Sequence, residues 1–270
     1  MNKQWERALV TGASTGIGEA FARELASRGS DLVVVARRGE LLEQLAAELG
    51  SKHGIEAEVV TADLTDPKAV TEVEARLEAA ERPIDLLVNN AGGSTELLPF
   101  LERDRERLAS DAYLNALALL RLTHAGAQAM ARRGHGNVLN VSAGIAFYPL
   151  PGAAVYGAGK AFVNSLSEAL DYELRDTGVH VTTVCPGFTR TGSQARLGMN
   201  VEWVPRHWWT DPEDVAVRAL RAAARGRSVT SLTKIGALNA FFGRYLPHRF
   251  WLPRVSRMQR RLYGPVQPSR

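Results

Sequence analysis

The feature that most constrains the fold of this chain is a regular alternation of short apolar runs with longer runs of helical periodicity. The apolar runs lie at 7–11, 31–36, 56–60, 84–89, 137–142 and 179–184. The helical patterns lie at 17–28, 40–50, 67–80, 103–133, 155–176 and 212–225. Apolar strands separated by helices indicate βαβ units, whose right-handed crossovers build a parallel sheet covered by helices on both faces. We therefore expect a doubly wound α/β fold.

The composition and the lack of internal boundaries indicate one globular domain. Of the 270 residues, 45% are hydrophobic and 23% are charged, which is typical of a globular protein. No linker, repeat or low-complexity stretch interrupts the alternation. We expect a single domain over residues 1–235 and a basic, aromatic C-terminal extension over residues 236–270.

Several classes of protein are excluded by what the sequence lacks. Its one cysteine, Cys185, rules out an intrachain disulfide framework, and its six histidines have no zinc-binding spacing, so we expect no metal site. The first strand begins at Arg7, which leaves no space for a signal peptide. No apolar stretch reaches the roughly 18 residues that indicate a membrane span. We therefore expect a cytoplasmic protein.

A glycine-rich turn, Thr11-Gly-Ala-Ser-Thr-Gly-Ile-Gly18, follows the first strand and leads into a helix pattern. A strand, a glycine turn and a helix N-terminus together present backbone N–H groups to a pyrophosphate. Gly12 permits the tight turn, Gly16 lets the phosphates approach, and Gly18 lets the helix pack on the strand. Surface turns also use glycine, so it is the βαβ context that predicts a dinucleotide site.

The end of the second strand indicates which dinucleotide binds. Sites for NAD usually place Asp or Glu there, to accept hydrogen bonds from the ribose hydroxyls. This chain has Ala36 followed by Arg37 and Arg38, which offer donors to a 2′-phosphate. We therefore predict NADP(H) rather than NAD(H); the alternative is a solvated arginine pair at a helix start.

A tyrosine and a lysine stand four residues apart, on one face of the helix that begins near residue 155. A phenol of ordinary pKa, about 10, is a poor acid–base group at neutral pH, and a neighbouring ammonium would lower that pKa. Lys160 would thus make Tyr156 a usable acid or base. Ser142, at the end of a strand, would bind the substrate oxygen. Such a pair is also common on ordinary helices.

In the order and spacing of these elements, the chain resembles the short-chain dehydrogenase/reductase family over residues 6–235. The matching elements are TGASTGIG at 11–18, Asp63, Asn89-Asn90-Ala91-Gly92, Asn115, Ser142, Tyr156 with Lys160, and Pro186-Gly187 with Thr191. The resemblance implies a Rossmann-like fold and an oxidoreductase that uses a nicotinamide cofactor.

The resemblance also implies a catalytic role for four residues. Tyr156 would be the general acid in carbonyl reduction and the general base in alcohol oxidation. Ser142 would orient the carbonyl, and Lys160 would bind the nicotinamide ribose. Asn115 would hold a water in the proton relay behind Lys160.

For the cofactor, the resemblance implies that Asp63 accepts from the adenine amino group and that Asn89 and Ala91-Gly92 shape the adenosine ribose site. Thr191 would hold the carboxamide. Asp63 alternatively closes a turn. Members with the strongest NADP signal carry a basic residue where this chain has Thr15. The complete predicted set is Gly12, Ser14, Thr15, Gly16, Ile17, Gly18, Arg37, Arg38, Asp63, Leu64, Asn89, Ala91, Gly92, Tyr156, Lys160, Pro186, Gly187, Thr189 and Thr191.

The substrate is indicated by residues 187–211, the segment that this family uses as a lid. Large apolar side chains suggest a hydrophobic ketone or aldehyde, a secondary alcohol, or a 3-oxoacyl or steroid-like compound. They are Phe188, Leu197, Met199, Trp203, Val204, Trp208 and Trp209. The alternative is that some of the tryptophans only dock the lid on the body or on a second subunit.

Two other functions are compatible with this fold. One is a catalytically silent NADP-binding sensor or assembly subunit, which would be indicated by a broken tetrad or glycine loop. The other is an epimerase or dehydratase, whose C-terminal domain is usually larger. Members of the family commonly form homodimers or homotetramers through the helices at 103–133 and 155–176. Contacts expected there are Leu117, Leu120, Phe162 and Leu166.

The positive charge of the chain is concentrated near its C-terminus. Residues 215–270 contain 12 Lys or Arg and no Asp or Glu, which leaves 21 Lys or Arg against 29 Asp or Glu in residues 1–214. No nucleic-acid-reading motif accompanies these charges, so we expect no nucleic acid partner. Apolar residues at helical spacing over 235–246, and Val255, Met258 and Leu262, favour docking of this tail on protein. Peripheral contact with an anionic membrane is the alternative.

Overall fold

The predicted alternation of strands and helices forms one parallel sheet in the computed structural model, which describes residues 3–94, 96, 98–245, 253, 255–257 and 260–261. Within these residues, seven strands run in the order β3-β2-β1-β4-β5-β6-β9, and every neighbouring pair is parallel. The strands are β1 (Arg7–Thr11), β2 (Asp31–Ala36), β3 (Ala57–Thr61), β4 (Leu86–Asn89), β5 (Gly136–Val141), β6 (Val179–Cys185) and β9 (Val229–Ser231). The predicted doubly wound α/β fold is confirmed.

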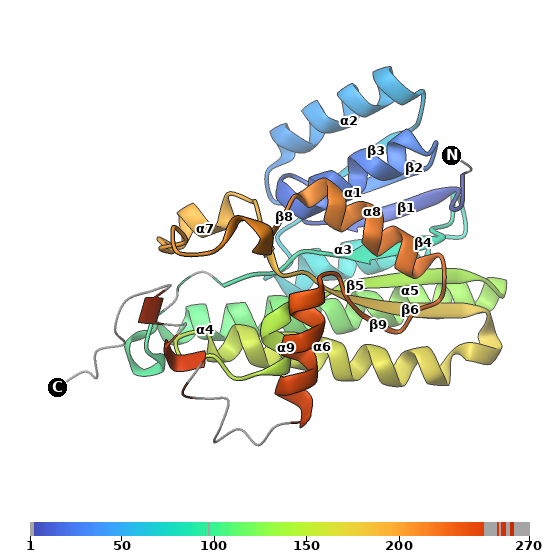
Figure 1. Cartoon of the computed structure of the whole chain (residues 1–270). Coiled ribbons are helices and arrows are strands. Elements are labelled where there is room, and N and C mark those ends of the chain that lie inside the picture. Colours follow the sequence, from blue (N-terminus) through green and yellow to red (C-terminus); the bar gives the residue numbers. More distant parts are fainter. Residues whose placement is uncertain are drawn as a thin grey trace.

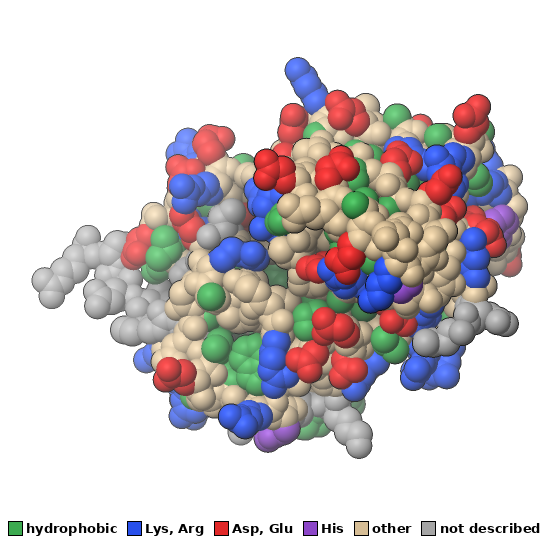
Figure 2. Space-filling view, turned by 90° about the horizontal axis from the view of Figure 1, so that it is seen from above, with side chains coloured by type: hydrophobic (Ala, Val, Ile, Leu, Met, Phe, Trp, Pro, Cys, Tyr) green, Lys and Arg blue, Asp and Glu red, His purple; other side chains and the backbone are tan. Residues whose placement is uncertain are grey.

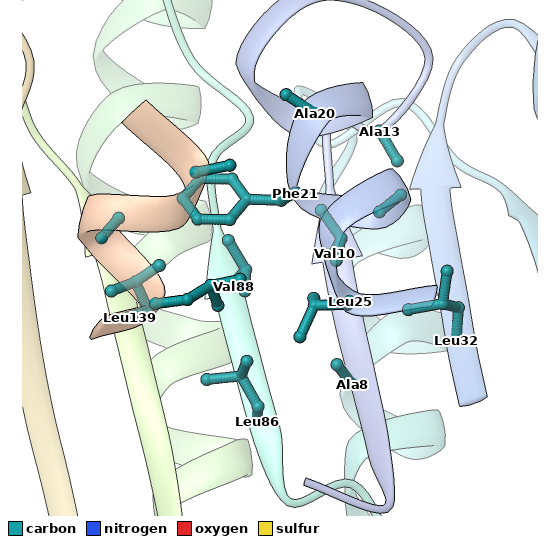
Figure 3. Close-up of a cluster of buried hydrophobic side chains, with 14 of the residues drawn as sticks. Ala8, Val10, Ala13, Ala20, Phe21, Leu25, Leu32, Leu86, Val88 and Leu139 are labelled. Atoms are coloured by element: carbon teal, nitrogen blue, oxygen red, sulfur yellow. The ribbon is translucent and has the colours of Figure 1, made fainter. Parts of the chain in front are cut away.

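Helices cover both faces of the sheet (Figure 1). One face carries α1 (Gly16–Ser27), α2 (Gly39–His53) and α8 (Pro212–Ala223). The other carries α3 (Pro67–Glu78), α5 (Leu119–Arg133) and α6 (Ala154–Glu173). Because successive residues of a strand point to opposite faces, Val10 belongs to the first core and Leu9 to the second. Figure 3 shows the first core, with Phe21 pointing from α1 into it.

The long helix predicted over 103–133 is interrupted at the place where it carries Asn115. It consists of α4 (Arg105–Ala112), a π-helical turn η2 (Tyr113–Ala118) and α5. Such turns are frequent at functional sites. The Asn115 side chain donates to the Asp111 carbonyl at 2.8 Å, about one turn earlier in the helix. A π-helical turn contains one residue more than an α-helical turn, and the apolar periodicity of the sequence does not reveal it.

Two further elements follow in the C-terminal part of the chain. Strand β9, which the sequence patterns did not predict, has only three half-buried residues and pairs with β6. Helix α9 (Lys234–Tyr245) follows the predicted run over 235–246 and contacts β9. The predicted domain boundary at 235 falls at its second residue, and that division of the chain stays a prediction. Leu246, Met258 and Leu262 lie outside the described residues.

The predicted lid forms a separate small unit beyond the sheet. It contains β7 (Phe188–Thr189), α7 (Ser193–Arg196), a 3-10 turn η5 (Arg206–Trp208) and β8 (Trp209–Thr210). The strands β7 and β8 pair with each other, so the two ends of the lid are tied together. In Figure 1 the lid lies to one side of the sheet, next to the carboxyl ends of the strands.

The described residues carry charges of both signs on the face that Figure 2 shows. Figure 2 shows acidic and basic side chains interspersed over the coloured part of one face, rather than one continuous basic surface. Within the described ranges, none of the helices combines the length and the apolarity needed to cross a bilayer.

Candidate active site

The strand order places a crevice between the loops that follow β1 and β4. The chain goes from β1 to β2 on one side and reaches β4 on the other, and in open α/β sheets ligands bind at such a switch point. A cleft of about 1580 Å³ lies there, lined by residues that follow the carboxyl ends of the strands. Pockets for a single drug-sized molecule measure roughly 300–1,000 Å³, so this cleft has space for a dinucleotide and a second molecule.

Most residues of the predicted cofactor set line this cleft. They are Gly12, Ser14, Thr15, Gly16, Ile17, Arg37, Arg38, Asp63, Leu64, Ala91, Gly92, Tyr156, Lys160, Pro186, Gly187, Thr189 and Thr191. Gly18 and Asn89 are outside the lining, as is the predicted catalytic Asn115, whereas Ser142 is in it. The residues that the sequence patterns predicted therefore line one continuous cleft. The three exceptions are Gly18, Asn89 and Asn115, which lie beneath it or in the interior.

The glycine loop has the close approaches that its sequence predicted. Gly12 and Gly16 have φ values of +67° and +63°, which side chains rarely adopt. A Cβ atom added to Gly18 would lie 2.1 Å from the Gly12 carbonyl oxygen, so this glycine lies beneath the turn rather than in the cleft. The loop leads directly into α1, a helix of 12 residues whose first residues, Gly16 and Ile17, line the cleft. These features fit a pyrophosphate.

The rim of the cleft near β2 is basic. Arg38 donates to the hydroxyls of Ser14 at 3.1 Å and of Thr15 at 3.0 Å, so it lies across the glycine loop. Arg37 is 73% exposed, and its guanidinium lies 3.9 Å from an Asp63 carboxylate oxygen. Ala36 offers no carboxylate at the end of β2. Two guanidinium groups without an acid at the strand end fit a phosphate on the adenosine ribose.

Asp63 lines the cleft and also closes a local turn. Its Oδ1 accepts from the amide and the hydroxyl of Thr65, at 3.0 and 2.8 Å. Asp63 therefore forms the turn of the alternative interpretation, and its side chain also lines the cleft. Its other oxygen faces Arg37.

The structure corrects the role given to Asn89. Its side chain is buried and donates to Thr123 and Asn140, in the interior of the protein. The next residue, Asn90, lines the cleft instead and donates to the Thr11 carbonyl at 3.0 Å. Both asparagines belong to the Asn89-Asn90-Ala91-Gly92 motif. The motif therefore predicted the correct segment of the chain, but the asparagine that faces the cleft is Asn90 rather than Asn89.

Ser142, Tyr156 and Lys160 converge in the floor of the cleft. The hydroxyl of Ser142 donates to the Lys160 carbonyl at 3.0 Å. The Lys160 ammonium donates to the Val141 carbonyl at 2.9 Å and lies 5.8 Å from the centre of the Tyr156 ring. Helix α6 thus brings Tyr156 and Lys160 beside the end of β5, as their spacing predicted.

The protein alone does not have the predicted low pKa at Tyr156. Burial raises the pKa of this phenol to about 12, and the Cys185 thiol nearby acts in the same direction. Burial also lowers the pKa of Lys160 to about 8. The expectation was wrong because removal from water disfavours both charged forms, and the ammonium is bonded to the Val141 carbonyl rather than to the phenol oxygen.

Asn115 lies behind this floor, outside the cleft lining. It is fully buried, donates to the Gly93 carbonyl at 2.6 Å, and accepts from the Gly93 amide at 3.0 Å. A Cβ atom added to Gly92 would lie 2.9 Å from Asn115 Oδ1 and 3.0 Å from Lys160 Nζ. Both predicted catalytic side chains therefore lie close against Gly92, which leaves no space for a side chain there.

The end of the cleft beyond Tyr156 is mainly apolar. The lid contributes five of its seven predicted apolar residues to the lining, and the body supplies the opposite wall. These residues are Phe188, Leu197, Met199, Trp208 and Trp209 from the lid, and Leu114, Ile145, Tyr148, Leu150 and Ala153 from the body. Trp203 and Val204 are outside the lining, so these two predicted lid residues do not face the cleft.

Comparison with known proteins finds the same family that the motifs indicated. A family model described as short chain dehydrogenase matches residues 6–201. The very-long-chain 3-oxoacyl-CoA reductase of Bos taurus is 33% identical over 192 residues, which cover 69% of this chain and 60% of the bovine enzyme. The chain thus matches about three-fifths of the length of that relative.

Two solved structures resemble the chain over most of its length. A short-chain dehydrogenase from Sphingobium yanoikuyae in complex with NADPH has a TM-score of 0.80 and 35% identity, covering 92% of this chain and 95% of its own. The bulky-bulky ketone specific alcohol dehydrogenase from Comamonas testosteroni has a TM-score of 0.75 and 34% identity, covering 84% of this chain and 85% of its own.

Proposed function

The chain belongs to the short-chain dehydrogenase/reductase family, and we propose that it transfers hydride reversibly between NADP(H) and a bulky hydrophobic ketone or secondary alcohol. The observation that carries this proposal is the convergence of Ser142, Tyr156 and Lys160 between a basic and an apolar half of one cleft. The basic half suits a phosphorylated dinucleotide. The apolar half suits the substrate.

The residues at the junction of the two halves supply proton transfer. When bound, NADPH would supply the hydride. The Tyr156 phenol is protonated at neutral pH, because burial raises its pKa to about 12. It would still donate to the carbonyl oxygen during hydride transfer, because the alkoxide that forms there is a stronger base than a phenolate. Ser142 would add a second hydrogen bond to that oxygen, because its hydroxyl can rotate away from the Lys160 carbonyl.

Lys160 is suited to restore the proton that Tyr156 gives away. Its pKa of about 8 lies close to neutral pH, so it can release and regain a proton at little cost. Asn115, held by Gly93 and lying, like Lys160, close against Gly92, would complete the path toward solvent. The lid and the apolar wall would exclude bulk water from the reacting groups.

The size and character of the substrate follow from the apolar walls. Ten apolar or aromatic residues line the outer half, where the lid also contributes Arg196 and His207. The relatives named for very-long-chain 3-oxoacyl-CoA and for bulky-bulky ketones support the same class. We infer that the carbonyl carries at least one large apolar substituent.

NADP(H) is the proposed cofactor because of the basic rim. Replacing Ala36-Arg37 by Asp-Ile should shift preference toward NADH, since a carboxylate repels the 2′-phosphate and accepts from ribose hydroxyls. Dissociation constants for NADPH and NADH, measured by fluorescence titration with both proteins, test this. Equal affinities of the unmodified protein for the two cofactors would contradict the assignment.

Two further predictions about partners remain. A homodimer or homotetramer is supported by Leu117 and Phe162, which are 49% and 37% exposed on the helices predicted to associate. Peripheral membrane contact stays a prediction for the outer side of α9, where Leu238, Phe241 and Tyr245 are exposed.

The proposed activity is tested by the loss of NADPH absorbance with a panel of aryl, alicyclic, steroidal and 3-oxoacyl ketones. Tyr156→Phe should bind NADPH as the wild type does, yet lose turnover by about 10²–10⁴-fold, because only the transferable proton is removed. A variant that keeps more than a tenth of the wild-type rate would overturn the role of Tyr156. Failure of the wild type on the entire panel, with NADPH bound, would instead favour the silent cofactor-binding protein.

A further inference from the structure

We propose that the C-terminal segment around Val255 braces the substrate wall and thereby limits the size of ketone that the cleft admits. The inference deepens the proposed function, because it names a further determinant of specificity for the same cleft. It concerns the part of the basic tail that the structure describes, residues 253, 255–257 and 260–261.

Val255 is buried against the back of the wall that faces the substrate. Only 3% of its surface is exposed, and it forms an apolar cluster with Leu150 and Ala153. Ile145 and Tyr148 pack against the same cluster. All four of these neighbours line the cleft, whereas Val255 does not. Val255 therefore lies outside the lining and would influence the cleft through these neighbours.

The helix before this segment is fixed to the same stretch of wall. Helix α9 packs on the 3-10 turn η3 (Gly144–Phe147), which carries Ile145. The contact is close, since a Cβ atom added to Gly243 would lie 2.2 Å from the Phe147 carbonyl oxygen. The wall over 145–153 is thus held from two directions, by α9 and by Val255.

The same segment reaches the lid on the other side of the cleft. The Arg261 guanidinium lies 5.9 Å from the centre of the Trp203 ring, a cation–π distance. Trp203 in turn donates to the Asn200 carbonyl at 3.1 Å, within the lid. The tail therefore contacts both the wall and the lid, which are the two surfaces that enclose a substrate.

Because of these contacts, the size of the side chain at position 255 should determine the position of the wall. A smaller side chain leaves space behind Leu150 and Ala153, so the wall can move outward and admit a larger group. A larger side chain pushes them toward the cleft. Because one methylene in an apolar pocket changes discrimination by roughly 10-fold or more, we expect opposite shifts from the two changes.

The experiment uses the full chain with Val255→Ala and Val255→Phe, and Val73→Ala as the matched control. Val73 is also fully buried, but on α3 and outside the cleft lining. Two quantities are measured for each protein. One is hydrogen–deuterium exchange of residues 145–153. The other is the ratio of kcat/KM for a diaryl ketone to kcat/KM for a small methyl ketone.

Val255→Ala should speed exchange over 145–153 and raise the ratio about 10-fold, and Val255→Phe should lower the ratio by a similar factor. Val73→Ala should leave both quantities as in the wild type. Unchanged exchange in Val255→Ala would overturn the brace, and a ratio that stays constant or moves the same way in both variants would overturn the specificity role. Absence of turnover in the wild type is a failure of the proposed function, and the exchange result then decides the brace alone.

Discussion

Replacing Gly92 by Ala perturbs the proposed proton path at one point. Gly92 has no positive φ, so alanine can adopt its backbone conformation without strain. The added Cβ atom would lie 2.9 Å from Asn115 Oδ1 and 3.0 Å from Lys160 Nζ, whereas ordinary contacts begin at 3.4 Å. Both side chains are buried and hydrogen-bonded, so neither can move into solvent. The methyl group must therefore displace at least one of them.

The magnitude follows from the size of that displacement. Relief of the two contacts requires a shift of about 0.4–0.5 Å, and a misplacement of about 1 Å can cost 10²-fold in rate. We expect kcat to fall by roughly 10–30-fold, which corresponds to about 1.4–2 kcal/mol in the barrier. The Lys160 hydrogen bond to the Val141 carbonyl, 2.9 Å long, should lengthen in the variant.

The assay compares kcat at saturating NADPH and ketone for the wild type, Gly92→Ala and Gly157→Ala. Gly157 is the matched control, because it neighbours Tyr156 on α6 and a Cβ atom there would meet Ile145 at an ordinary 3.5 Å. Gly157→Ala should retain kcat within about twofold and gain about 0.5–1 kcal/mol of stability from helix propensity. A Gly92→Ala enzyme with kcat within twofold of wild type would refute the argument.

Two further predictions concern pH and assembly. The folded pKa of Lys160, about 8, lies below its usual value of 10.5, so between these values the unfolded chain binds the extra proton and stability rises with pH. Relative to Lys160→Met, the wild type should therefore gain about 2 kcal/mol of unfolding free energy from pH 8 to pH 10 in urea titrations, and an equal response of both proteins would contradict the lowered pKa. Replacing both Leu117 and Phe162 by Glu should convert the oligomer into a monomer, because both side chains are exposed on the helices predicted to associate. Light scattering measures the oligomeric state, and a wild type that is already monomeric would disprove this prediction.

Local patterns were sufficient for the fold because its elements are set by short-range periodicity. Six predicted strands and most predicted helices agree with the structure to within a few residues. The spacing of Tyr156 and Lys160 was reliable for the same reason, since residues four apart on a helix share a face. Strand β9 was missed because three half-buried residues carry no periodic signal.

The direction in which a side chain points, and the pKa shifts that burial causes, were decided only by the tertiary structure. A shift of one residue at a strand end turns a side chain from the interior to the cleft, which is why Asn90 rather than Asn89 lines it. The raised pKa of Tyr156 and the lowered pKa of Lys160 come from removal from water by residues far apart in the sequence.

The sequence by itself predicted six strands of the sheet, the glycine loop and the candidate reacting side chains, because periodicity and residue spacing act over a few turns of chain. Only the tertiary structure decided that Val255 supports the wall formed by Leu150 and Ala153, about one hundred residues earlier in the chain. The physical reason is that burial of an apolar side chain has no preferred direction. A pattern can show that such a side chain will be buried, but only the folded surface decides where it packs.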